Sequence, residues 1–132
     1  MHAYTLYWSV RPFGASVLLA CADVGGGGAS LYMLDPAGEV YRYHGSAIGK
    51  GRAQAKTEIE RLKLSELTCR EAVVEVAKII HRCHDEKDKA FECELSWLCE
   101  ESGWQHVRVP ADIAKQAVAD AKAALEAAGM ED

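Results

Sequence analysis

The sequence predicts an α+β fold, in which antiparallel strands and helices form separate clusters. Between residues 15 and 45, short apolar segments alternate with turns rich in Gly, Pro and Asp, a pattern typical of a strand meander. Between residues 46 and 86, apolar residues recur every three or four positions, which is the period of a helix. Clustered strands followed by clustered helices favour α+β over an alternating α/β order. A length of 132 residues allows one domain, 1–132, and no second core of similar size.

Residues 1–14 are expected to contain the end of a helix that begins outside this chain. Its last turns would run from Tyr4 to Val10, because Pro12 cannot continue a helix and Gly14 follows at once. A helix this short is marginal on its own, so it needs packing against other elements.

A three-stranded antiparallel meander is expected over residues 15–45. Its strands are Val17–Cys21, Ser30–Leu34 and Glu39–His44. The first strand is apolar at almost every position, which predicts that both of its faces are covered. Gly25–Gly28 forms a flexible turn after it, and Asp35–Gly38 has the Asp, Pro and Gly positions of a β-turn.

Two helices are expected over residues 46–86. The first runs from Gly51 to Leu64, with one apolar face formed by Ala55, Ile59 and Leu62. Thr68 and Glu71 have the spacing of a capping box, which predicts the start of the second helix. The second helix is expected to end at the charged segment Asp85–Lys89 and to bury Val73, Val76, Ala77 and Ile80.

A β-hairpin is expected over residues 90–109 and a final helix over residues 110–129. Apolar and polar residues alternate from Phe91 to Cys99, the pattern of a strand with one buried face. Glu101–Gly103 turns the chain into a second strand, Trp104–Val109. Pro110 is suited to the first position of a helix. The expected apolar stripe of this helix is Ile113, Ala117, Ala121 and Leu125, with Gly129 as a cap after its end.

Charge and hydropathy exclude two classes of partner. Fifteen Lys and Arg against twenty Asp and Glu give a net charge of −5 without a cationic cluster, so nucleic acid is not expected. The longest apolar run, Ala15–Ala22, is far below the ~20 residues that span a bilayer, so no membrane segment is expected. A secretory signal has a basic residue before its apolar core, and the N-terminus of this chain has none there. The expected location is the cytoplasm and nucleus.

Neither glycine-rich segment has a nucleotide-binding pattern. Gly25–Gly28 is followed by Ala29 and a strand, whereas a phosphate loop leads through Lys and Ser or Thr into a helix. Gly49–Gly51 does enter a helix, but it contains only two of the three glycines of a dinucleotide fingerprint. A turn and a closely packed junction are the favoured interpretations, and no cofactor-binding residue is predicted.

The histidines and cysteines near residue 80 raise the hypothesis of a zinc site. The candidate ligands are His81, Cys83, His84, Cys93 and Cys99. Positions 81 and 84 share a helix face, but position 83 points elsewhere, and the last two cysteines fit the buried positions of a strand. A partly exposed helix end is therefore favoured, and no metal is predicted. The odd number of cysteines, five, favours reduced thiols over a disulfide framework.

No motif supports a nucleophilic site. The residue types of a catalytic triad occur in Asp23, Asp35, His44 and Ser46, but no spacing motif joins them, so no catalytic residue is predicted. Two tryptophans, Trp97 and Trp104, flank the hairpin turn. Core packing is favoured for Trp97, whereas packing and an interface role are about equally supported for Trp104.

Several segments together resemble the second half of a proteasome alpha subunit. They are Tyr4–Thr5, Val10–Gly14, Leu31–Gly38, Ala47–Gly51 and Ala55–Glu58. A further set resembles the alpha type-3 branch of that family, the seventh alpha position of the eukaryotic 20S core: Leu67–Glu71, Val76–Ile80, Lys87–Glu92 and Glu94–Trp97. The final helix matches in place and composition only.

This resemblance implies part of the N-terminal-nucleophile hydrolase fold, a four-layer α-β-β-α sandwich with two antiparallel sheets. Alpha subunits of this family are non-catalytic, form the outer rings, contact the beta rings and receive regulators. The implied function is a structural subunit that supports ring assembly and ubiquitin-dependent protein degradation. The implied partners are other alpha subunits, beta subunits and, indirectly, regulatory particles. Thr5 does not correspond to the processed N-terminal threonine of beta subunits, because Met1 to Tyr4 precede it.

The resemblance covers the second half of the family's sequence, so the N-terminal half, with its gate and regulator pocket, is expected to be missing. Half of a sandwich leaves strand edges and an apolar face without cover, which predicts aggregation or low cooperativity for the isolated chain. The rival hypotheses are a stand-alone small α+β binding module, a hydrolase that uses the His and Cys residues, and a truncated paralogue without proteasomal function.

Overall fold

The computed structural model describes residues 1–25, 27–84 and 91–129. In chain order the elements are η1 (His2–Thr5), β1 (Val17–Ala22), β2 (Ala29–Leu34), β3 (Val40–Tyr43), α1 (Arg52–Glu60), η2 (Leu64–Glu66), α2 (Cys69–Cys83), β4 (Ser96–Trp97), η3 (Glu100–Ser102), β5 (Val107–Arg108) and α3 (Ala111–Gly129), where η denotes a 3₁₀ helix.

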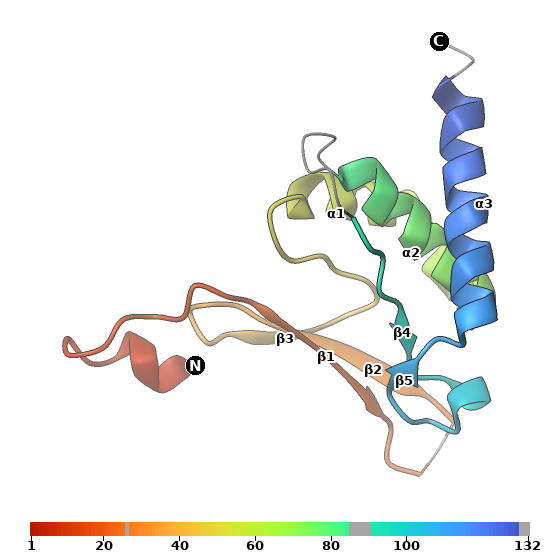
Figure 1. Ribbon diagram of the computed structural model, residues 1–132. Helices are drawn as coiled ribbons and strands as arrows, with labels where there is room; N and C mark the ends of the chain where they lie inside the picture. Colours follow the sequence, from red (N-terminus) through yellow and green to blue (C-terminus); the bar gives the residue numbers. More distant parts are fainter. Residues whose placement is uncertain (26, 85–90, 130–132) are drawn as a thin grey trace.

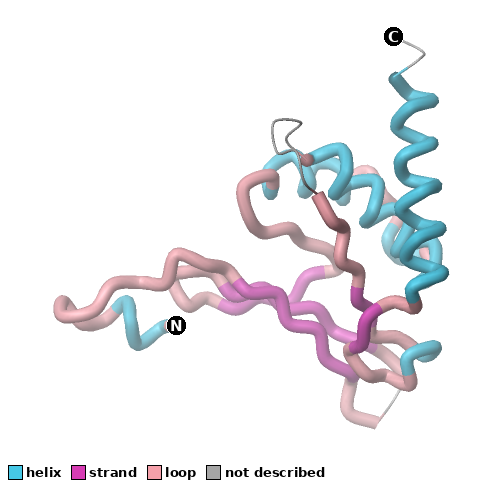
Figure 2. Tube along the Cα trace, in the orientation of Figure 1, coloured by secondary structure: helices cyan, strands magenta, loops and turns pink. Residues whose placement is uncertain are grey.

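The strands form two antiparallel sheets, one in the order β1-β2-β3 and one that contains β4 and β5. The α-helices lie on one side of the three-stranded sheet, and no described α-helix lies on the other (Figure 1). Figure 2 shows the three-stranded sheet and the α-helices in separate regions of the molecule. The α+β prediction and the antiparallel meander are therefore confirmed.

The turn between β2 and β3 is the β-turn that the sequence predicts. The Gly38 N–H donates to the Asp35 carbonyl over 3.0 Å, and the Asp35 carboxylate accepts from the Glu39 N–H over 2.9 Å. Gly38 has a φ of +87°, where residues with a Cβ are strained. A Cβ at this glycine would come within 2.7 Å of the His2 Cα, so the N-terminal segment packs directly on this turn.

The strand register assigns the sheet residues to two faces. Leu18 pairs with Met33 and lies beside α1 and α2 residues, so this face is turned toward the helices. Leu19 pairs with Tyr32 on the opposite face, because successive side chains alternate between faces. We call the second face the outer face; its apolar residues are Val17, Leu19, Cys21, Tyr32, Leu34 and Val40.

The predicted cover on both faces of Val17–Cys21 is wrong for this structure. All six residues of β1 are exposed, and Leu19 retains 49% of its accessible surface. The physical reason is position: β1 lies at the edge of its sheet, only part of its inner face meets the helices, and no described element packs on the outer face.

The capping box predicted for the second helix is present at the start of α2. The Glu71 N–H donates to the Thr68 hydroxyl oxygen, and the Glu71 carboxylate accepts from the Thr68 N–H over 2.8 Å. The buried side of α2 differs from the prediction. Val73 and Ala77 are buried as expected, but the third buried residue is Ile79. The two other predicted positions, Val76 and Ile80, are exposed because they face a groove, described below.

A small core lies where α2, the β4-β5 pair and α3 meet. Its buried residues are Val73, Trp97, Cys99, Val109 and Ala117. The stripe predicted for the last helix faces this region, and its two central residues, Ala117 and Ala121, are at most 2% exposed. Small side chains at these positions let α3 approach α2 closely.

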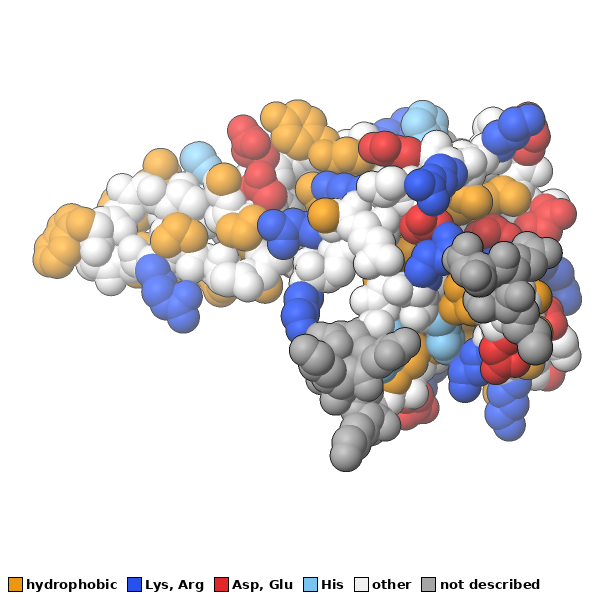
Figure 3. All heavy atoms as spheres, turned by 90° about the horizontal axis from the view of Figure 1, so that it is seen from above, with side chains coloured by type: hydrophobic (Ala, Val, Ile, Leu, Met, Phe, Trp, Pro, Cys, Tyr) orange, Lys and Arg blue, Asp and Glu red, His pale blue; other side chains and the backbone are white. Residues whose placement is uncertain are grey.

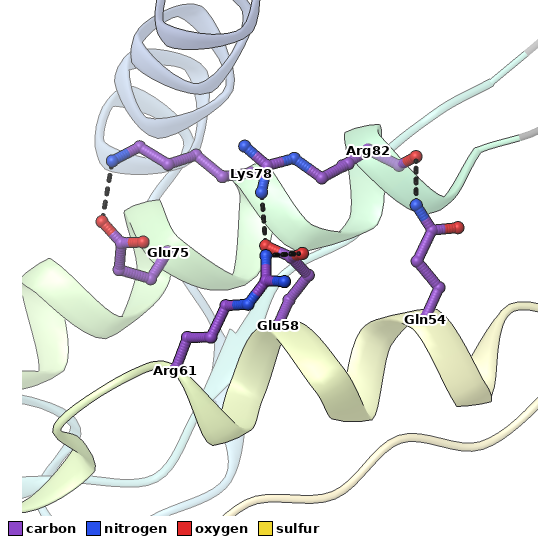
Figure 4. Close-up of polar contacts among 6 residues, drawn as sticks. All are labelled: Gln54, Glu58, Arg61, Glu75, Lys78 and Arg82. Carbon is purple, nitrogen blue, oxygen red and sulfur yellow. Dashed lines mark hydrogen bonds and ion pairs between the residues drawn. The ribbon is translucent and has the colours of Figure 1, made fainter. Parts of the chain in front are cut away.

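Polar contacts join α1 to α2 (Figure 4). Glu58 of α1 pairs with Arg82 of α2, and also with Arg61 over 2.9 Å. The Gln54 side-chain amide donates to the Arg82 carbonyl. These contacts fix the two helices as one unit.

Four element predictions need correction. The helix expected from Gly51 to Leu64 ends at Glu60, and Leu64 begins the separate 3₁₀ helix η2. The helix end expected from Tyr4 to Val10 is a single 3₁₀ turn, His2–Thr5, because a segment this short before Pro12 cannot offset the cost of helix nucleation. The hairpin strands shrink to Ser96–Trp97 and Val107–Arg108, because only these residues have ladder partners. Gly129 is the last residue of α3 and does not follow its end. The charged segment Asp85–Lys89 lies outside the described residues.

Candidate assembly surface

The outer face of the sheet is an apolar surface without cover. It displays Val17, Leu19 and Val40, whose side chains are each more than a third exposed. Within the described part of the chain, β1 and β3 also lack a neighbour on their outer edges. Unpaired strand edges and exposed apolar patches are features of surfaces that bind another polypeptide.

An apolar groove of about 420 Å³ lies between the inner face of β1 and the helices. Leu18 contributes from the strand, and Ile59, Val76 and Ile80 contribute from α1 and α2. Phe91 closes one end, where its ring stacks on His84 with centroids 4.3 Å apart. The groove explains why Val76 and Ile80, which were predicted to be buried, are exposed. The sheet does not pack tightly against the helices at this point.

The N-terminal segment forms a projecting arm rich in exposed apolar side chains (Figure 3). These side chains are Tyr4, Leu6, Tyr7, Trp8, Val10 and Phe13. Tyr4 and Phe13 contact each other with ring centroids 4.7 Å apart, whereas Trp8 is 99% exposed. Such an arm gains stability only by packing on further apolar surface, because each buried aromatic contributes about 1.5–3 kcal/mol.

The carboxylates and hydroxyls of the candidate triad each have another partner in the described part of the chain. The Asp23 carboxylate accepts from the Ser30 hydroxyl over 2.6 Å, and the Ser46 hydroxyl contacts the Met33 sulfur. Asp35 is occupied by its own turn. The Thr5 hydroxyl donates to the His2 carbonyl over 2.7 Å inside the 3₁₀ turn. Each of these groups therefore has a local structural role.

The glycine segments act as turns and junctions. Gly25 and Gly27 adopt positive φ between β1 and β2. A Cβ at Gly51 would lie 3.3 Å from the Cys83 Cβ, so this glycine lets α1 start close to the end of α2. These contacts agree with the interpretation of the two segments as a turn and a closely packed junction.

The proposed zinc ligands are divided between two places. His81 and His84 pack on Phe91, and the His81 Nδ1 lies 2.8 Å from the Ala77 carbonyl oxygen. Cys99 lies in the core. Burial raises the pKa of the Cys83 and Cys93 thiols, which disfavours the thiolate that a metal requires. Among the described residues, no three His, Cys, Asp or Glu side chains form a metal-binding group.

The tryptophans occupy three different environments. Trp97 is in the core, as expected, and Trp104 is half-buried with a φ of +60° after the left-handed Gly103. Sequence reasoning assigned no role to Trp8, which the structure places on the exposed arm. The missed signal was the density of aromatic residues from Tyr4 to Trp8, which is unusual for a segment with so little regular structure.

Across the described ranges, no helix has both the length and the apolar composition needed to cross a bilayer. The features that remain are the outer face, the groove and the arm. All three are apolar, and burial of their exposed side chains or backbone groups against another surface would be favourable. This geometry suits association with other protein segments better than it suits binding of a small molecule.

Comparison with known proteins finds one family that matches most of this chain. Residues 1–98 match the proteasome subunit family. The chain is 61% identical over 127 residues to the proteasome subunit alpha type-3 of Oryza sativa, an alignment that covers 96% of this chain and 50% of the relative. It is 59% identical over 124 residues to the alpha type-3 subunit of Acanthamoeba castellanii, covering 93% and 48%.

The alpha type-3 subunit of Arabidopsis thaliana is 58% identical over 127 residues, with coverage of 96% of this chain and 50% of the relative. The chain therefore spans about half the length of the curated relatives that it matches. The family match covers most of the described strands and helices, including the whole meander and both α1 and α2. This chain belongs to the proteasome subunit family, and the relatives to which it is similar are alpha type-3 subunits.

Proposed function

We propose that this chain is a non-catalytic, structural alpha-type subunit of the 20S proteasome core. The observation that carries the proposal is the 61% identity to an alpha type-3 subunit along 96% of the chain. The uncovered outer face, the groove and the arm support it, because a subunit with a structural role needs surfaces for other polypeptides. In this role the chain supports ring assembly and, through it, ubiquitin-dependent protein degradation.

In this proposal, the sheet is completed by a polypeptide equivalent to the first half of the relatives. The apolar residues on both faces of β1 support this, since an edge strand with Leu18 exposed on one face and Leu19 on the other is stable only when covered. A second antiparallel sheet on the outer face and further helices beyond it would complete a four-layer α-β-β-α sandwich of the N-terminal-nucleophile hydrolase type.

The non-catalytic role is supported by the engagement of the candidate nucleophiles. The Thr5 hydroxyl donates within its own 3₁₀ turn, and Met1 to Tyr4 precede it, so its amine is not free to act as a base. The proposed partners are neighbouring alpha subunits and beta subunits, and indirectly regulatory particles. The proposed location is the cytoplasm and nucleus.

The first experiment tests completion of the sheet. The chain is co-expressed with a polypeptide that corresponds to the first half of the Oryza sativa relative, and the two are purified through a tag on one of them. We expect a soluble 1:1 complex with a cooperative melting transition. If both polypeptides are folded but separate on gel filtration at micromolar concentration, the completion proposal is wrong.

The second experiment tests the proteasomal role in cells. The tagged chain is followed by native gel and density gradient and compared with the migration of the complete core particle. We expect a fraction of the chain to co-migrate with the core. Recovery of the chain only in small or aggregated species would contradict the subunit role, while leaving family membership unchanged.

A further inference from the structure

Two thiols lie together where α2 begins and the β4-β5 hairpin turns. Cys69 is the first residue of α2, and Cys99 directly precedes η3. Their side chains lie on neighbouring parts of the fold, since Val73, one helical turn after Cys69, packs in the same core cluster as Cys99, and Arg70 pairs with Glu101. Neither residue has a part in the assembly surface, so this pair is independent of the proposed function.

These two contacts hold the segments together. The Arg70 guanidinium binds both carboxylate oxygens of Glu101 with N–O distances of 2.7–3.1 Å. On the other side, Val73 lies one helical turn after Cys69 and shares the core cluster with Cys99. Because these contacts are made by other side chains, the approach of the two thiols is built into the packing.

Cys99 is fixed by its backbone. Its N–H donates to the Ser102 hydroxyl oxygen over 3.0 Å, and its carbonyl accepts from the Ser102 hydroxyl and the Trp104 N–H, each over 2.9 Å. Cys99 is only 4% exposed, whereas Cys69 is exposed to solvent. An oxidant from solution therefore reaches Cys69 first, because Cys99 is shielded from solvent.

We propose that Cys69 and Cys99 are an oxidative modification site that forms a reversible disulfide on exposure to a hydroperoxide. The Cys69 thiolate sulfur attacks one peroxide oxygen, the O–O bond breaks, and a sulfenic acid forms as the second oxygen leaves and takes up a proton. The Cys99 sulfur then attacks the sulfenic sulfur, the S–O bond breaks and water leaves. Overall, two thiols and one hydrogen peroxide give one disulfide and two waters.

The environment makes this reaction slow at neutral pH. Partial burial, the contact with Cys99 and the nearby Glu101 carboxylate raise the pKa of the Cys69 thiol, so the thiolate is a small fraction of the population. Sustained oxidant is needed, but once a sulfenic acid forms, the neighbouring thiol resolves it in an intramolecular step.

The test uses the full chain with Cys21→Ser, Cys83→Ser and Cys93→Ser, which leaves only the pair. After hydrogen peroxide treatment, free thiols are blocked and the chain is digested with trypsin without reductant. We expect the peptide Leu64–Arg70 joined to the peptide Ala90–Arg108, with the mass of two hydrogens lost. Dithiothreitol should separate the two peptides. With dimedone present, the ratio of joined pair to trapped sulfenic acid should be about tenfold higher in native buffer than in concentrated guanidinium chloride, because packing holds Cys99 beside the sulfenic acid.

Two variants in the same background are the controls, with far-ultraviolet circular dichroism used to verify that each retains its helices. With Cys99→Ser, Cys69 should accumulate sulfenic acid that dimedone traps. With Cys69→Ser, Cys99 should stay reduced because it is buried. Equal ratios of joined pair to trapped sulfenic acid in native and unfolded chains would overturn the proposal. So would oxidation that yields only intermolecular dimers or sulfinic acid at Cys69.

Discussion

Gly38 lies where the N-terminal segment packs against the β2-β3 turn of the sheet. Its φ is +87°, and a Cβ placed on it would lie only 2.7 Å from the His2 Cα. The conformation alone disfavours any L side chain by about 1–2 kcal/mol. The contact adds a further penalty, because a backbone atom cannot move aside as the end of a side chain can.

We therefore expect Gly38→Ala to weaken the β2-β3 turn and to release His2 from it. The Asp35 N–H, which donates to the Glu39 carbonyl over 3.1 Å, should exchange with deuterium about tenfold faster, in line with a loss near 1.4 kcal/mol. Ala37→Ser is the matched control, since Ala37 is exposed in the same turn. Unchanged exchange in Gly38→Ala would show that the turn tolerates a Cβ and that His2 does not pack there.

Single residues also show what the sequence can and cannot reveal. The Asp, Pro and Gly positions of the Asp35–Gly38 turn act within four residues, so their roles were predictable. The burial of Ile79 in place of Val76 was not, because both lie on apolar sides of α2 and only the position of the sheet decides which side is closed. The contact between Cys69 and Cys99 joins residues far apart in the sequence, and no spacing rule indicates it.

At the scale of elements, the start of α2 depends on its capping box. Thr68 accepts from the Glu71 N–H and donates to the Glu71 carboxylate over 2.7 Å. We expect Thr68→Ala to cost about 1 kcal/mol of helix stability. The Glu71 and Ala72 amides should then exchange about fivefold faster, while amides beyond the middle of α2 change little. Thr57→Ala, within α1, is the control, and equal acceleration along the whole of α2 would contradict a local capping role.

The same box has a defined pH dependence. Hydrogen bonds from the Thr68 N–H and hydroxyl hold the pKa of Glu71 below its ordinary value of 4.5. Since the folded pKa is below the unfolded one, the carboxylate's contribution is fully present above the unfolded pKa and is lost as pH falls through the folded pKa. Nuclear magnetic resonance titration should find this depressed pKa, and Thr68→Ala should return it only part of the way toward 4.5, because the N–H of residue 68 still donates to the carboxylate. A Glu71 pKa that the substitution leaves unchanged would mean that the Thr68 hydroxyl does not contribute to the shift.

Elements were predictable where their signals are local. The capping box and the apolar spacing located α1, α2 and α3, and the turn residues located β1, β2 and β3. The hairpin strands were overestimated because alternation from Phe91 to Cys99 describes which side chains are apolar, whereas a strand exists only where a partner pairs with it. The N-terminal helix end failed for a similar reason: without neighbouring turns, the segment keeps only one 3₁₀ turn.

At the scale of the whole molecule, the chain has more apolar surface than its own elements cover. The small core between α2 and α3 and the exposed sheet have few contacts with each other, so we expect them to unfold separately. In isolation the chain should aggregate at micromolar concentration or melt over a broad range of temperature. Scanning calorimetry combined with analytical ultracentrifugation checks this. A sharp, reversible two-state transition of a monomer would contradict the prediction.

The outer face gives the most direct test of what the exposed apolar surface binds. Leu19 lies in the middle of β1 on the outer face and is 49% exposed, so Leu19→Lys should cost little in the isolated chain and should reduce its aggregation by placing a charge on an edge strand. In the complex with the first half of a relative, the same lysine would be buried. The lost apolar burial alone amounts to about 2 kcal/mol, and desolvation of the ammonium adds to it.

We therefore expect Leu19→Lys to lower the affinity of the chain for that first half by more than about tenfold, measured by titration with a fluorescent label on the partner. Val24→Lys is the matched control, because Val24 is fully exposed in the turn after β1 and lies away from the outer face. It should change neither aggregation nor affinity. If Leu19→Lys improves solubility and leaves the affinity intact, the outer face is not where the first half of the relative packs. The free edges of β1 and β3 would then be the remaining routes to completion, because strand pairing there uses backbone groups that this substitution does not alter.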